Sequence, residues 1–253
     1  SSLGHSSFNK YLQEPKSYLI FTFIMCKFNT ISLDAADTLF FIKKGLGNTY
    51  YEILKKYTDK FKPKEISDCF KKYFNSRHGL YFSGLQGPEL ENAEKDWWYR
   101  LVKDIFDDLG MFDSFDDYFN ELYKHFEFDA WAIYDDTIPF LQELKGRGFK
   151  IIITSNFDSR IFKVCDGFGI SPYINHFTIS SQSGCAKPDK DFFLKSLNDS
   201  GSDIKTTVHI GDNPELDYKA CKRIGLKAFL IDRDARINGD YVINSLLSVL
   251  RKI

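Results

Sequence analysis

A few residues of this chain have types and positions that suit phosphoryl chemistry. Asp34, Ser155 and Asp212 each follow an apolar run that predicts a buried strand, and Lys187 lies in a loop after another such run. Parallel sheets bind ligands beyond the carboxyl ends of their strands, so we expect these four side chains to meet at one edge. Asp217 comes shortly after Asp212 and is expected close by.

Two carboxylates, a hydroxyl and an ammonium group at one sheet edge can act together on a phosphate ester. Carboxylate oxygens bind a hard divalent cation such as Mg²⁺. The hydroxyl, the ammonium group and nearby backbone N–H groups neutralise phosphate oxygens. One carboxylate can also attack phosphorus to give an aspartyl-phosphate, which divides a difficult transfer into two steps.

The strands that must position these residues alternate with helices in the second half of the chain. Apolar runs predict strands at 28–33, 149–153, 176–180, 206–210 and 227–231. Helical spacing predicts helices at 138–145, 159–168, 189–197 and 215–224. Continuous apolar strands separated by helices indicate an α/β fold, with a doubly wound, mainly parallel sheet covered on both faces.

A helical segment interrupts this α/β pattern directly after the first strand. Apolar side chains recur at helical spacing near residues 50–57, 66–73, 98–109 and 115–126. We expect residues 42–131 to form four amphipathic helices packed as a bundle. The α/β unit is then made of residues 25–41 and 132–253.

The first 24 residues do not fit either unit. An apolar run at 18–24 is too short to span a bilayer, and no small-residue cleavage site separates it from the first predicted strand. Met25 would start a chain in which Asp34 follows nine residues later. Residues 1–24 are therefore expected to be an extension or a remnant of expression.

Composition excludes some partners. Lys and Arg number 34 against 35 Asp and Glu, a net charge of −1, which gives no electrostatic reason to expect a nucleic-acid or membrane partner. The five cysteines are scattered without a C-x-x-C pair, so we expect small buried hydrophobes in a reducing compartment, the cytoplasm. The sequence does not determine the oligomeric state.

The motifs around Asp34, Ser155, Lys187 and Asp212 resemble, in order, the four motifs of the haloacid dehalogenase superfamily. The helical insertion after the first motif is similar to the C1 cap of that family. The resemblance covers about residues 28–235 and implies a Rossmann-like hydrolase core.

The resemblance implies a nucleophile and a metal site. Asp34 matches the nucleophile, which is also a Mg²⁺ ligand, and Asp212 matches the second carboxylate ligand. The residue two positions after the nucleophile donates its backbone carbonyl to the metal in this family, and here that residue is Ala36.

The resemblance also implies a phosphate site. Ser155 matches the motif hydroxyl, and with Asn156 and Lys187 it is expected to bind phosphate. Lys187 would in addition steady the nucleophile. Asp217 matches a second acid of the last motif and is expected to orient its neighbours.

Ala36 departs from the family pattern. Phosphatases of the family normally carry a second Asp there, which protonates the leaving group and later activates water. Such general acid–base help is worth ~10²–10⁴ in rate. Asp37 is displaced by one residue, which along a strand would aim it at the opposite face, although a turn here leaves a substitution by Asp37 open.

Two functions of different class follow. The first is a Mg²⁺-dependent hydrolase that acts through Asp34 on a small phosphorylated metabolite. The second is a weak or inactive relative that binds a phosphorylated ligand or a protein partner, which Ala36 favours. Dehalogenation dispenses with metal, phosphonatases need a cap lysine in surroundings that Lys71 and Lys72 lack, and response-regulator receivers have no helical insertion.

Plainer structural roles remain for several of these residues. Ser155 and Asn156 are typical turn formers, and Asp212 or Asp217 can cap a helix. Substrate selection is expected from residues 78–98, where Trp97 faces either the substrate or the bundle and Trp98 is expected in the bundle core. His209 lies within a predicted strand and is expected to pair with a backbone group.

Overall fold

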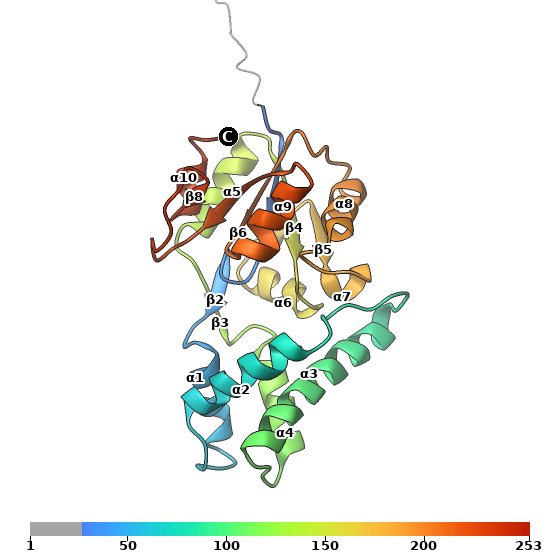
Figure 1. Ribbon diagram of the computed structural model, residues 1–253, viewed down its shortest axis with the longest axis vertical. Coiled ribbons are helices and arrows are strands. Elements are labelled where there is room, and N and C mark those ends of the chain that lie inside the picture. Colours follow the sequence, from blue (N-terminus) through green and yellow to red (C-terminus); the bar gives the residue numbers. More distant parts are fainter. Residues whose placement is uncertain (1–26) are drawn as a thin grey trace, which may run out of the picture.

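A computed structural model of the protein describes residues 27–253. The extension predicted for residues 1–24 lies outside the described residues. The described chain forms a sheet packed between helices, and a second group of helices lies beyond one edge of that sheet (Figure 1).

Six parallel strands make the sheet, in the order β5-β4-β1-β6-β7-β8. Their bounds are β1 Thr30–Leu33, β4 Lys150–Ser155, β5 His176–Ile179, β6 Thr207–Gly211, β7 Lys227–Ile231 and β8 Val242–Ile243. All side chains of the central strand β1 are buried, and Leu33 pairs with Ile153 of β4 and with Ile210 of β6. The predicted doubly wound, mainly parallel sheet is confirmed.

Helices cover both faces of the sheet. They are α5 Thr137–Gly146, α6 Arg160–Gly167, α7 Ser180–Ser183, α8 Lys190–Asp199, α9 Ala220–Arg223 and α10 Leu246–Val249, with a short turn η1 at Ser171–Tyr173. Alternate side chains of β7 enter different clusters: Phe229 and Ile231 pack in the larger core, which includes α5, α6 and α10, whereas Ala228 packs with α8 and α9.

The helix expected at 215–224 forms differently. It begins as a π-helical turn, η2 (Pro214–Lys219), and continues as α9. The side chain of Asn213 accepts from the backbone N–H groups of Glu215 and Leu216 at 2.9 and 3.0 Å, which caps this start. Because π-helical turns occur often at functional sites, this segment is a candidate part of such a site.

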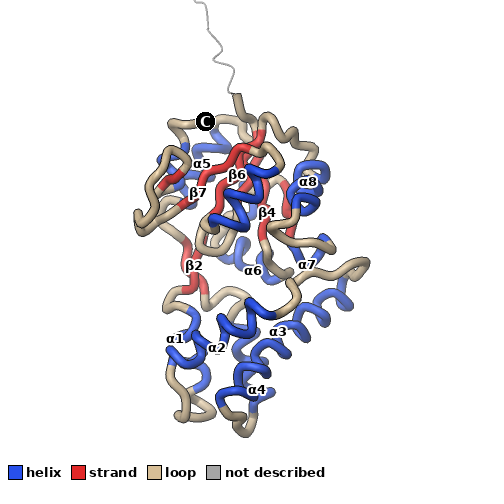
Figure 2. The backbone as a smooth tube through the Cα atoms, viewed as in Figure 1, coloured by secondary structure: helices blue, strands red, loops and turns tan. Residues whose placement is uncertain are grey.

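A two-stranded ribbon carries the chain between the layers. β2 (Phe40–Ile42) pairs antiparallel with β3 (Trp131–Ile133), and Figure 2 shows both between the sheet and the lower helices. The rings of Phe40 and Trp131 pack edge to face, 5.2 Å apart. The sequence pattern contained no sign of this ribbon because each strand has only three residues. The predicted domain limits at 42 and 131 fall on it and stay predictions.

We call α1 to α4 the cap helices, and they are the four helices expected. They span Leu46–Leu54, Pro63–Ser76, Gly87–Leu109 and Phe115–His125. They bury their own hydrophobic cluster, in which Phe106 and Tyr118 are fully buried. None of the described helices is long and apolar enough to cross a membrane.

The described cysteines are all free. Cys165 and Cys221 are buried, as expected for small hydrophobes, whereas Cys69 and Cys185 are only half-buried. The expectation of burial is therefore right for two of these four residues.

Phe106 tests the packing of the cap helices. Phe106→Ala should lower the free energy of unfolding by ~3–5 kcal/mol, because it leaves a cavity among the rings of Phe61, Phe112 and Tyr118. Met111→Ala is the control, since Met111 is 41% exposed and its loss should cost less than ~0.5 kcal/mol. Urea titration followed by tryptophan fluorescence measures both, and equal losses would contradict this packing.

Candidate functional site

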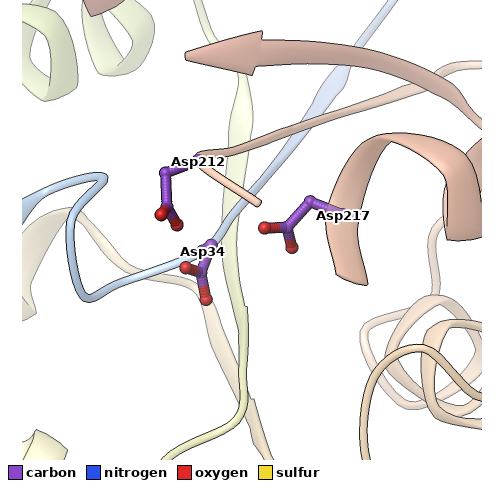
Figure 3. Close-up of side chains that lie close together, drawn as sticks. All are labelled: Asp34, Asp212 and Asp217. Carbon is purple, nitrogen blue, oxygen red and sulfur yellow. The ribbon is translucent and has the colours of Figure 1, made fainter. Parts of the chain in front are cut away.

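Three carboxylates meet at the carboxyl edge of the sheet (Figure 3). Asp34 follows β1, Asp212 follows β6, and Asp217 comes back from η2. One oxygen from each lies within 4.8 Å of the others. The expected convergence of these aspartates is therefore present in the structure.

Lys187 is buried between two of the carboxylates. Its Nζ lies 2.6 Å from Asp34 Oδ1 and 2.6 Å from Asp217 Oδ1, and the residue is only 5% exposed. Burial alone would lower the pKa of Lys187, but the charges of Asp217 and Asp34 outweigh it and raise the pKa. Lys187 therefore stays protonated and holds the two acids in place.

Asn156 fixes the segment that carries Lys187. Its Oδ1 accepts from the backbone N–H of Lys187 at 2.8 Å, and its Nδ2 donates to the backbone carbonyl of the same residue at 3.0 Å. Both ends of the amide are thus engaged within the protein, which makes Asn156 a positioning residue. Its predicted contact with phosphate stays a prediction.

His209 belongs to the site, which corrects the expectation that it pairs with a backbone group. Its Nε2 is hydrogen-bonded to Asp217 Oδ1 at 3.0 Å, and its Nδ1 to Ser32 Oγ at 2.8 Å. Ser32 also donates to Thr154 Oγ1 at 3.0 Å. Ser32 and His209 face each other across β1 and β6, so polar residues inside apolar strands were the signal that could have found them.

Asp217 is held from several sides. Lys187 Nζ donates to Oδ1, and His209 Nε2 is hydrogen-bonded to the same oxygen. The backbone N–H of Asn213 donates to Oδ2 at 3.1 Å. These partners overcome the effect of burial and keep the pKa of Asp217 well below its usual range. A Cβ at Gly211 would lie 2.2 Å from Asp217 Cγ, so only glycine lets this carboxylate approach.

Asp212 is the carboxylate without such compensation. Burial first, and then the charges of Asp34 and Asp217, raise the pKa of Asp212 to about 8. Among the described residues its side chain makes no hydrogen bond, and Asp34 accepts only at Oδ1. Asp34 and Asp212 thus have carboxylate oxygens that are free to bind a metal, together with excess negative charge. Both properties fit a hard divalent cation. Asp217 has both oxygens engaged and fits an orienting role better.

Ser155 and Ala36 also lie at this edge. Ser155 ends β4, next to β1, and is 2% exposed. Ala36 is half-buried in the turn between β1 and β2. Asp37 follows in a left-handed conformation, with φ 58°, and its backbone N–H donates to Phe40 at 2.7 Å. The chain has therefore left the strand geometry before Asp37, which is exposed. Partial desolvation, and then the charge of Asp34, raise the pKa of its side chain.

A cavity of about 890 Å³ lies between this edge and the cap helices. Ala36, Asn156 and Lys187 line it on the sheet side. Trp97 and Trp98 both line it on the cap side and are half-buried. Trp98 packs against the cap cluster, as predicted, but it is not a fully buried core residue. The reason is that the Trp98 indole turns toward the sheet layer to donate a hydrogen bond to Asp158 Oδ2 at 2.6 Å.

Buried polar pairs join the cap helices to the sheet layer. Asp158 accepts from Arg160 through both oxygens, at 2.9 and 2.6 Å, in addition to the Trp98 bond. Glu94 of α3 accepts from the backbone N–H and the hydroxyl of Ser159, at 3.1 and 2.9 Å. These bonds hold the cap helices against the rim of the cavity.

Comparison with known proteins identifies the relatives of this chain. The haloacid dehalogenase-like hydrolase family model matches residues 28–225. Haloacid dehalogenase-like hydrolase domain-containing protein 3 of Danio rerio is 26% identical over 205 residues, 79% of this chain and 83% of that protein. Glyceraldehyde 3-phosphate phosphatase of Methanocaldococcus jannaschii is 32% identical over 120 residues, 45% of this chain and 53% of the relative.

A solved structure has the same fold. A haloacid dehalogenase-type hydrolase of Bacillus subtilis, crystallised with magnesium, superimposes with a TM-score of 0.72 at 15% identity, over 89% of this chain and 98% of the other. This likeness extends over both the sheet and the cap helices.

Asp212 predicts a dependence of stability on pH. Without divalent cations, the free energy of unfolding should fall as pH rises from about 5 to about 8. Folded Asp212 keeps its proton up to about pH 8, whereas the unfolded chain loses it near the ordinary value of about 4. The folded state thus binds more protons over this interval, and stability is lost as they leave.

Urea denaturation at several pH values, in protein treated with chelator, measures this slope. The slope should be smaller in Asp212→Asn. Burial also raises the pKa of Glu94, so Glu94 should account for part of the slope that remains in the variant. Excess Mg²⁺ should oppose the loss, because it binds the ionised carboxylates. Equal slopes in the variant and the parent would refute the assignment to Asp212.

Proposed function

This chain belongs to the haloacid dehalogenase-like hydrolases, and from that premise we propose that it hydrolyses phosphate monoesters through an aspartyl-phosphate on Asp34. The single observation that carries the proposal is the buried contact of Lys187 with Asp34 and Asp217 beside the uncompensated Asp212. The phosphatase named among the relatives and the magnesium bound to the Bacillus subtilis structure support it.

Asp34 is the proposed nucleophile. One of its carboxylate oxygens forms a bond to phosphorus while the ester P–O bond breaks, and the alcohol oxygen leaves with the electron pair. Lys187 orients Asp34 through the contact with Oδ1, and together with Ser155 it offsets the charge of the phosphate oxygens. The exclusion of water by the cap helices would protect this step.

Mg²⁺ is the proposed cofactor. Asp34, Asp212 and the backbone carbonyl of Ala36 would hold it, and it would supply positive charge close to the phosphate oxygens. Asp212 is the residue whose chemistry fits this role best, since its raised pKa reflects negative charge without a partner. Water would then attack the aspartyl-phosphate, release inorganic phosphate and restore Asp34.

Asp217 and His209 are proposed as positioning residues. Asp217 fixes the Nζ of Lys187, and His209 together with Ser32 fixes Asp217. This chain of hydrogen bonds reaches Asp34 through Lys187 and reaches the segment of Asp212 through the backbone N–H of Asn213. Its loss should therefore weaken catalysis without removing the nucleophile or the proposed metal ligands.

Ala36 favours a second candidate function. Its methyl group cannot protonate a leaving group, so a protein that binds a phosphorylated ligand or a partner without turning it over is the alternative. The intact contact between Lys187 and Asp34 speaks for hydrolysis, because binding alone does not require a nucleophile held against an ammonium group.

Asp34→Asn tests the proposal. The variant should lose at least ~10³-fold in phosphate release from a panel of phosphate esters, because an amide oxygen is a poor nucleophile. Asp107→Asn is the matched control, since within residues 27–253 Asp107 pairs only with Lys103, on the exposed surface of α3. Release of inorganic phosphate measures both variants.

The metal requirement is measured on the same panel. Chelation of divalent cations should abolish release, and added Mg²⁺ should restore it. Hydrolysis that survives Asp34→Asn would refute the proposed nucleophile. Binding of phosphate analogues with no release from any ester would favour the second candidate.

A further inference from the structure

The cavity next to the site is larger and more apolar than a small phosphorylated metabolite needs. Its volume is about 890 Å³, near the upper end of the usual range for ligand pockets. A three-carbon phosphate would occupy a small part of that space and would leave aromatic surface against water. The residues that line the cavity therefore indicate the chemical nature of the part of the substrate that lies beyond its phosphate group.

Aromatic rings form the cap side of the cavity. Phe74 is 43% exposed although it is a large hydrophobic residue, and it lines the cavity. Its ring stacks on Phe70 at 5.3 Å and on Trp98 at 6.3 Å, and meets Trp97 edge to face at 5.9 Å. Such a wall is suited to another flat ring, because aromatic pairs attract each other beyond the effect of buried area.

The two indole N–H groups and the two guanidinium groups of this wall pair within the protein. Trp97 donates to the carbonyl of His78 at 3.0 Å, and Trp98 donates to Asp158. The guanidinium of Arg77 pairs with Asp104, and that of Arg160 pairs with Asp158. The cations near the rings are thus neutralised within the protein, and a sugar or a second phosphate gains no free charged partner from these groups.

The sheet side of the cavity adds a chemical constraint. Ala36 lines the cavity, and its side chain has no group that can donate a proton. Asp37 follows as an exposed residue, and its backbone N–H donates to the carbonyl of Phe40 in the turn. A leaving group that enters the cavity therefore meets a methyl group where a proton donor would be needed.

The absence of a proton donor selects among leaving groups. A phenol has a pKa of about 10, as tyrosine does, so it leaves readily as its anion. An aliphatic alcohol has a pKa close to that of water, about 16, and its alkoxide leaves only with a proton supplied. A phosphate ester of a phenol therefore suits both the aromatic wall of the cavity and Ala36 on its sheet side.

We propose that the substrates are phosphate monoesters of aromatic hydroxyl compounds, whose ring lies in the aromatic cavity and whose phenolate leaves without general acid help. This inference rests on the proposed function. In the first step the bond from Asp34 to phosphorus forms, the bond from phosphorus to the aryl oxygen breaks, and the phenolate takes its electron pair and a proton from water. In the second step water gives inorganic phosphate and frees Asp34.

A set of simple esters separates the two parts of the proposal. In the presence of Mg²⁺, kcat/KM for phenyl and naphthyl phosphate should exceed that for benzyl phosphate by at least ~10²-fold, because benzyl carries the ring but leaves as an alkoxide. Naphthyl phosphate should also show a KM at least ~10-fold below that for acetyl phosphate, which has a good leaving group and no ring.

Two substitutions assign these effects to residues. Phe74→Ala should reduce the preference for naphthyl over acetyl phosphate about 10-fold, whereas Leu194→Ala, with the same 43% exposure outside the cavity, should not change it. Ala36→Asp should raise kcat/KM for benzyl phosphate by ~10²-fold and for phenyl phosphate by less than ~10-fold.

The outcomes distinguish this inference from its premise. Hydrolysis of glycerol 3-phosphate or benzyl phosphate as fast as phenyl phosphate would overturn the aromatic substrate class and leave the phosphatase intact. A preference for naphthyl phosphate that survives Phe74→Ala would likewise overturn it. If neither acetyl phosphate nor any ester is hydrolysed, in the parent and in Asp34→Asn alike, the proposed function itself fails.

Discussion

A lysine buried between two carboxylates is the interaction on which the rest of the site depends. The removal of one ammonium and two carboxylate groups from water is expensive, and the cost is recovered only when the geometry is good and the remaining hydrogen-bonding positions are filled. Here the two contacts of the Lys187 Nζ are both 2.6 Å. The site therefore tolerates little displacement of β1, of the Lys187 segment or of η2, and much of the surrounding structure serves to prevent it.

Each of these segments is fixed by a specific contact. Asn156 binds the backbone of Lys187 on both sides, and His209 connects Asp217 to Ser32 at the centre of the sheet. The lack of a side chain at Gly211 lets Asp217 come close. The π-helical turn η2 presents Asp217 to this network, at the expense of a regular helix. Asp212 remains outside it, with the negative charge that a cation would offset.

The cap helices bring a different environment to the same edge. They have a hydrophobic cluster of their own, yet buried polar contacts from Trp98 and Glu94 attach them to the sheet layer. The space between is thus bounded by charged groups at the sheet and by aromatic rings at the cap. The charged sheet edge would bind the phosphate, and the aromatic cap side would bind the leaving group. An aromatic leaving group would also need no proton donor at Ala36.

The sequence alone determined the alternation of strands and helices, the four cap helices and the meeting of Asp34, Lys187 and Asp212, because these follow from local periodicity and from the geometry of parallel sheets. Only the tertiary structure decided that Trp98 faces the sheet layer and that His209 binds Asp217. It also decided that the helix predicted at 215–224 begins with the π-helical turn η2. These features depend on partners distant along the chain, whose positions no local pattern encodes.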